Sequence, residues 1–135
     1  MEYILYGIFP FLHYFPLDTC HRRSLVSIFD MNGGKMPTFV LMTKHNPKSL
    51  HDASGRKQMG KEWLHKVKET CPEVKWIAHY AILGPYDFMD IYSAPDVETA
   101  HKVSLISRSE GAIEAESWQA LEYRDFLGVL REIEG

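Results

Sequence analysis

The segment VKWIAHYAILGPYDFMDIYSAPD (residues 74–96) decides the fold, because two apolar runs flank a Gly-Pro pair within it. Glycine supplies backbone freedom and proline fixes φ, so Gly84-Pro85 is typical of a turn. The runs on either side, 74–84 and 86–94, are rich in β-branched and aromatic residues and predict two strands of one hairpin. Pro95-Asp96 then predicts the start of a helix, with Asp96 as its N-cap. The segment therefore predicts a β-hairpin that leads directly into a helix.

Outward from this hairpin, the chain alternates between strand and helix patterns. Residues 38–44 (TFVLMTK) read as a strand, and residues 55–71 show apolar side chains every three or four positions, as in an amphipathic helix. The helix after Asp96 ends near Gly111, and residues 112–121 read as a fourth strand before a short helix over 122–132. The order β-α-β-β-α-β predicts an α+β, ferredoxin-like fold, in which a four-stranded antiparallel sheet carries two helices on one face.

The predicted sheet is apolar on both faces. The first strand places Phe39 and Leu41 on one side and Val40 and Met42 on the other. Helices cover only one face, and a second apolar face needs a cover of its own. We therefore predict a homodimer that packs sheet to sheet with two-fold symmetry. The C-terminal helix, folded over the open face, is the competing cover.

The first 35 residues differ from the rest. The stretch MEYILYGIFPFLHYFPL is apolar, but it is too short for a membrane span and contains Pro10 and Pro16. It also lacks the basic start and the cleavage site of a signal peptide. Two glycine codons at Gly33-Gly34 can encode a ribosome-binding sequence just before Met36. We predict that residues 36–135 form the domain, and that residues 1–35 are a translated non-native leader or else a disordered, apolar extension; a membrane-surface anchor over 1–17 ranks below both.

Composition excludes several classes of function. The chain has 135 residues, enough for one domain, and its net charge of −3 argues against nucleic-acid binding. Cys20 and Cys71 lie far apart, which favours reduced thiols and a cytoplasmic location. The histidines show no metal-ligand spacing, and no nucleotide-binding fingerprint occurs. We expect no metal, no cofactor and no membrane association.

The residues MPTFVLMTK, Gly84-Pro85-Tyr86-Asp87 and Ala94-Pro95-Asp96 resemble the GYD domain family over about residues 36–126. This resemblance implies a dimeric α/β barrel of the ferredoxin-like type. It does not imply a reaction, because related barrels include cofactor-free oxygenases, haem-dependent enzymes, isomerases and small-molecule sensors.

His79 and Asp90 are the candidate catalytic residues. Each is a polar residue in the middle of an otherwise apolar strand, and a symmetric hairpin places them opposite each other. A carboxylate beside an imidazole can orient the ring as a general base. The same two residues also make sense as a satisfied core pair or as exposed groups.

Four further residues are candidate ligand-binding residues: Tyr86, Asp87, Trp118 and Arg108. Tyr86 and Asp87 can equally serve the turn, since adjacent strand residues point to opposite faces. Arg108 can bind an anion or simply complement a helix C-terminus, and Trp118 fits a core, an interface or a pocket wall.

Two functions follow from these residues. The first is a homodimer that binds a small molecule or a partner protein. The alternative is a cofactor-free enzyme, oxygenase-like or isomerase-like, that uses His79 and Asp90 in a pocket of some hundreds of Å³ between sheet and helices.

Overall fold

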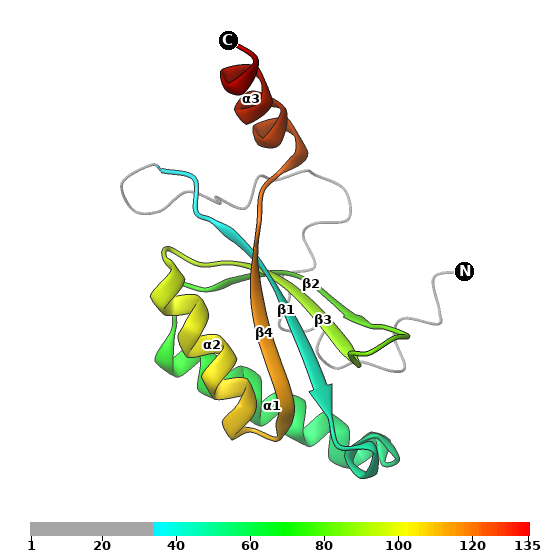
Figure 1. Cartoon of the computed structure of the whole chain (residues 1–135). Coiled ribbons are helices and arrows are strands. Elements are labelled where there is room, and N and C mark those ends of the chain that lie inside the picture. The colour runs from blue at the N-terminus through cyan, green and yellow to red at the C-terminus, as the bar shows by residue number, and fades with distance from the viewer. Residues whose placement is uncertain (1–33) are drawn as a thin grey trace, which may run out of the picture.

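The computed structural model describes residues 34–135, which contain one antiparallel sheet, three α-helices and a short 3₁₀ helix (Figure 1). The elements follow the predicted order, with bounds β1 Thr38–His45, η3 Pro47–Leu50, α1 Ala53–Thr70, β2 Lys75–Ala81, β3 Phe88–Ser93, α2 Val97–Ser109, β4 Ala112–Ala120 and α3 Tyr123–Glu134.

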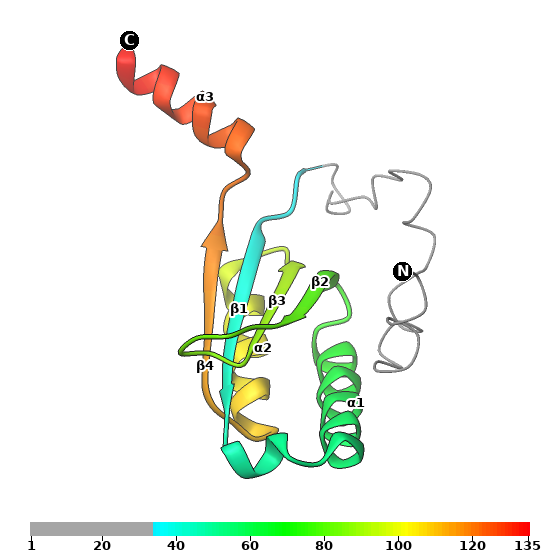
Figure 2. The ribbon, with the colours of Figure 1, turned by 90° about the vertical axis from the view of Figure 1, so that its right-hand side faces the viewer.

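The strands lie in the order β2-β3-β1-β4, and every neighbouring pair is antiparallel. α1 and α2 cover the same face of the sheet (Figures 1 and 2). The predicted ferredoxin-like α+β fold is therefore confirmed. α2 begins where the sequence predicts, because the Asp96 side chain accepts a hydrogen bond from the Thr99 backbone N–H at 2.7 Å.

The hairpin differs from its prediction at the turn. β2 ends at Ala81 and β3 begins only at Phe88, so Tyr86 and Asp87 precede the strand instead of opening it. The Asp87 backbone still bonds to both sides, since its N–H donates to the Thr43 carbonyl and its carbonyl accepts from the Ile82 N–H. Gly84, with φ of +152°, supplies the backbone conformation that the turn needs.

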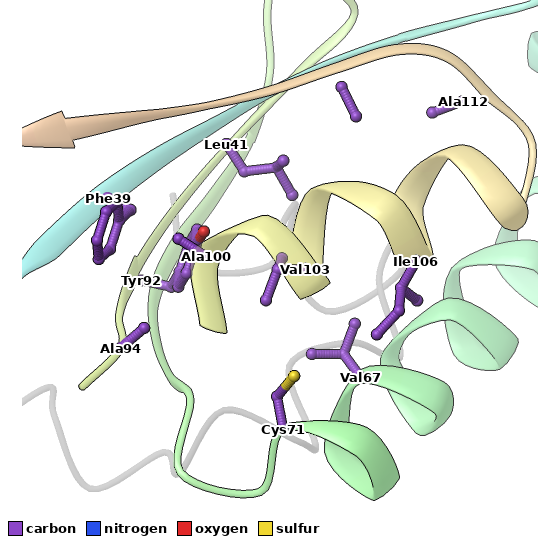
Figure 3. Packing of buried hydrophobic residues seen from close by; sticks show 11 residues of the cluster. Phe39, Leu41, Val67, Cys71, Tyr92, Ala94, Ala100, Val103, Ile106 and Ala112 are labelled. Atoms are coloured by element: carbon purple, nitrogen blue, oxygen red, sulfur yellow. The ribbon is translucent and has the colours of Figure 1, made fainter. Parts of the chain in front are cut away.

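The core lies between the sheet and the two helices. Leu41 and Tyr92 reach it from the sheet, Val67 and Cys71 from α1, and Val103 from α2 (Figure 3). Aromatic rings extend it, since Tyr92 contacts both Phe39 and Trp76, and Trp76 contacts Trp63. The fully buried side chains leave this part of the interface closely packed.

The other face of the sheet carries apolar side chains that neither α1 nor α2 covers. We call this the outer face and define it by six residues, four on the central strands and one on each edge strand: Val40, Met42, Met89, Ile91, Tyr80 and Trp118.

α3 does not lie over the outer face of its own sheet. It continues from β4 away from the sheet, and none of its residues is buried (Figures 1 and 2). Lys35 holds its first turn through ion pairs to Glu122 at 2.5 Å and Asp125 at 2.7 Å. The alternative in which this helix covers the open face within one chain is therefore not what the structure shows.

The N-terminal predictions concern residues that lie almost entirely outside the described part of the chain. Described residues begin at Gly34, and Met36 is buried just before β1. The leader over 1–35 and the domain boundary at Met36 remain predictions.

Candidate functional site

His79 and Asp90 lie opposite each other, as the hairpin pattern predicts. They are register partners on β2 and β3, and His79 Nδ1 is 2.5 Å from Asp90 Oδ1. A register irregularity between Trp76 and Ala78 explains how both Trp76 and His79 reach the helix-covered side. These two residues are three positions apart, so a regular strand would place them on opposite faces. The bulge thus lets β2 supply a core tryptophan and a polar site residue to the same face.

The two residues open on a cavity. It has a volume of about 270 Å³ and lies between the sheet and the N-terminal half of α1, next to η3. Its apolar wall includes Leu50, Met59, Trp63 and Phe88, and its polar wall includes Thr43, His45, His51, Arg56, Lys57, His79, Asp90, Ser107 and Glu110. The His79–Asp90 pair therefore borders open space that a small molecule could enter, unlike a pair enclosed in a packed core.

The Phe88 ring contacts three residues of the polar wall. The His79 ring stacks on it with centroids 5.7 Å apart, and the His45 ring meets it edge-on at 5.5 Å. The Arg56 guanidinium carbon lies 4.5 Å from the centre of the same ring. A guanidinium over an aromatic face gains a cation–π attraction, which holds Arg56 at the cavity.

His45 is buried at the end of β1. Its backbone N–H donates to Asp87 Oδ2 at 2.8 Å, while its ring Nδ1 has no hydrogen-bond partner among the described residues. Burial and the nearby Arg56 cation lower the pKa of His45 to about 4, although Asp87 and the Gly111 backbone oppose the shift. The ring is therefore neutral at pH 7.

Sequence reasoning did not single out His45 or Arg56 as members of this site. A signal for His45 exists, because Phe39, Leu41, Thr43 and His45 alternate along one strand and so share its buried face. A signal for Arg56 exists as well, because it lies three positions before Met59 and seven before Trp63 and so shares their face of α1.

The structure separates Tyr86 from Asp87. Asp87 binds the His45 backbone, as the structural interpretation of the turn expects. Tyr86 instead meets Trp118 edge to face with ring centroids 6.0 Å apart, and its hydrogen bond with Glu116 raises the pKa of its hydroxyl. Neither Tyr86 nor Trp118 lines the cavity, so a ligand held by them would lie at the outer face.

Arg108 also lies away from the cavity. It is exposed in the last turn of α2, and its guanidinium donates to the Ala115 carbonyl at 3.4 Å. Within residues 34–135 there is no cluster of three metal-ligating side chains. None of the helices in that range is both long and apolar enough to cross a membrane.

Comparison with known proteins gives three findings. The sequence profile described as the GYD domain matches residues 39–130. The chain is 29% identical over 102 residues to a glutamine synthetase and cystathionine beta-lyase binding protein of Thermus thermophilus, covering 71% of this chain and all of that protein. Its fold is similar to the crystal structure of MtbAldR, with a TM-score of 0.46 and 8% identity, over 64% of this chain and 52% of that one, so the chain spans about half of that protein. Since the profile spans most of the sequence, the chain belongs to the GYD domain family.

Proposed function

We propose that this chain is a homodimeric binding protein that docks on a partner protein. The observation that carries the proposal is apolar surface that remains exposed among residues 34–135, at the edges of the outer face and along α3. On the outer face, Tyr80 is 53% exposed and Trp118 is 48% exposed. Exposed apolar groups that gather on one surface are typical of interaction sites.

The outer face suits a second copy of the chain. Its apolar residues form rows on neighbouring strands, with polar groups such as the Lys44–Glu114 ion pair at one end. A two-fold axis places this self-complementary surface against itself, as sheet packing requires. The open face of one copy then becomes the cover for the other.

α3 suits a different partner. Six apolar residues of α3 form one stripe at helical spacing, and all are at least partly exposed. Ile133, the last of them, is 76% exposed. They are Tyr123, Phe126, Leu127, Val129, Leu130 and Ile133. An amphipathic helix of this kind can dock in an apolar groove of another protein. The relative from Thermus thermophilus is named for binding two enzymes, which supports protein binding for this chain as well.

The dimer is tested by light scattering after size exclusion. We expect twice the chain mass for the wild type at micromolar concentration. Ile91→Glu places a charge in the middle of the outer face and should give monomers. Leu105→Glu is the matched control, since Leu105 is an exposed apolar residue on α2, and it should remain dimeric. A monomeric wild type would refute the dimer.

Partner binding is tested with the two enzymes in the relative's name, taken from the organism that encodes this chain. We expect at least one of them to bind in interferometry. Ile133→Glu should weaken that binding at least tenfold, and Leu105→Glu should leave it unchanged. If neither enzyme binds, or if Ile133→Glu binds as well as the wild type, this part of the proposal fails.

A second candidate function concerns the cavity. There, a small molecule would meet the hydrogen-bonded His79–Asp90 pair, and this arrangement favours a cofactor-free enzyme in which His79 takes a proton from the substrate. The Asp90 carboxylate would fix the ring and stabilise the imidazolium that forms. This role is tested by incubating the protein with small carboxylic acids in D₂O. NMR then measures whether a carbon-bound hydrogen of the acid is exchanged for deuterium. Exchange should require His79 and disappear in His79→Gln; bound compounds that never exchange would leave a binding cavity without catalysis.

A further inference from the structure

We propose that the cavity binds a small carboxylate with an apolar body, and that Arg56 anchors the carboxylate. This inference rests on the second candidate function, that the cavity takes a small molecule. It adds the chemical class of that molecule and the residue that recognises it.

Arg56 is the strongest donor in the cavity wall. Its guanidinium carries five N–H donors in a planar fork that matches a carboxylate. Phe88 holds the guanidinium from one side, yet within residues 34–135 no acceptor forms a hydrogen bond with it. The cation is thus positioned, half-buried and able to accept a partner.

The acidic groups around the cavity are already engaged. Asp90 is bound to His79, and Glu110 pairs with Lys66 at 2.6 Å. Asp87 accepts from the His45 backbone, and the charges of both Asp90 and Asp87 act on Arg56, although neither carboxylate forms a hydrogen bond or ion pair with it. The cations on the wall have no such contacts in the described chain, because neither Arg56 nor Lys57 has a salt-bridge partner there. The N–H donors of Arg56 therefore remain open to an added carboxylate.

The start of α1 adds to this preference. Ala53, Arg56 and Lys57 all belong to its first turns, no acidic residue occupies the first turn, and the Asp52 carboxylate caps the helix by accepting from the Ser54 backbone N–H. The N-terminal end of a helix carries partial positive charge and stabilises an anion. Asp52 uses the N–H groups at the cap, so a carboxylate in the cavity would be held by the side-chain cations of Arg56 and Lys57.

The apolar part of the lining selects an apolar body. Leu50, Met59, Trp63 and Phe88 provide aliphatic and aromatic surface. The volume of about 270 Å³ is just below the range of about 300–1,000 Å³ that is usual for ligand pockets. A single ring or a short branched chain fits this space better than a nucleotide or another large ligand.

The test uses phenylacetate and its uncharged isostere 2-phenylacetamide as probes of the whole chain. Binding is followed by NMR shifts of the lining residues and by calorimetry. We expect phenylacetate to bind at least tenfold tighter than the amide, and tighter than acetate or inorganic phosphate. Arg56→Gln should remove the preference for the acid, Arg56→Lys should keep part of it, and Arg108→Gln should change nothing.

Each outcome is decisive because the variants are checked for folding by circular dichroism. If acid and amide bind equally, or if folded Arg56→Gln and Arg56→Lys both bind like the wild type, the carboxylate inference is wrong while the cavity remains a binding site. If phosphate binds as tightly as phenylacetate, the site is a plain anion site and the apolar body is wrong. If no probe shifts any lining residue, the small-molecule function fails together with the inference.

Discussion

The two ends of the interface between the helices and the sheet are built differently. At one end Leu41, Val67, Tyr92 and Val103 are fully buried against one another. At the other end the same strands and α1 enclose a cavity whose wall carries Arg56 and other polar side chains. The first end is packed as a core must be, whereas the second combines space with buried polar groups, both of which reduce stability.

This contrast indicates where stability and function reside. One strand can serve both ends, since β3 gives Tyr92 to the packed end and Phe88 and Asp90 to the cavity. Apolar contacts dominate the packed end, and the polar side chains gather at the cavity end. We therefore expect substitutions at the packed end to act on folding and substitutions at the cavity to act mainly on binding.

The largest effect is expected from Leu41→Ala at the packed end. Leu41 is fully buried, and removing its side chain leaves a void that the dense neighbours cannot fill, so the free energy of unfolding should fall by about 3–4 kcal/mol. Leu50→Ala at the cavity is the matched control. Leu50 is already 39% exposed, and its loss should cost less than about 1 kcal/mol. Urea denaturation followed by circular dichroism measures both values, and equal losses would contradict the contrast.

The pH dependence of stability comes next, through His45. The folded state holds the pKa of His45 near 4, below the ordinary 6.5, so between these values the unfolded chain binds a proton that the folded chain does not. This group should therefore lower the free energy of unfolding as the pH falls from 6.5 to 4, by up to about 3 kcal/mol in total. The measurement compares wild type and His45→Gln across this range. Parallel curves for the two proteins would show that His45 does not titrate in this way.

The packed end was easier to predict from sequence than the cavity end. Val67 and Val103 recur with the other apolar residues of their helices, and Phe39 and Leu41 alternate along their strand. These periodic patterns predict which side chains are buried. The pairing of His79 with Asp90 followed from a symmetric hairpin. The bulge that turns His79 toward α1 could not be predicted from the sequence, because it depends on tertiary contacts. The helical period places Arg56 on the face of Met59 and Trp63, but it does not predict the contact of the guanidinium with Phe88, because that contact joins α1 to β3.

The His79–Asp90 pair should have an intermediate effect. Asp90→Ala leaves the partly buried His79 without its carboxylate and should cost about 2 kcal/mol, as expected for a hydrogen bond that involves a charged group. The double variant His79→Phe with Asp90→Leu replaces the pair by apolar groups and should be as stable as the wild type or more stable. Thermal and urea unfolding of the three proteins gives the comparison. A double variant less stable than Asp90→Ala would mean that the pair serves the fold and not the site.

The smallest effect is expected from Tyr92→Phe, which removes one hydroxyl group from the packed end. The Tyr92 hydroxyl is 2.8 Å from Ser117 Oγ, and Ser117 also contacts Ser104 at 2.8 Å. Removing the hydroxyl should cost only about 1 kcal/mol, because Ser117 keeps its second partner. Burial raises the pKa of Tyr92 to about 12, so the wild type should lose stability through this group as the pH rises above 10, where the unfolded chain ionises first. Tyr92→Phe should lack that part of the loss. The measurement is the free energy of unfolding between pH 9 and pH 11. If it changes with pH equally in the two proteins, ionisation of Tyr92 does not destabilise the folded state.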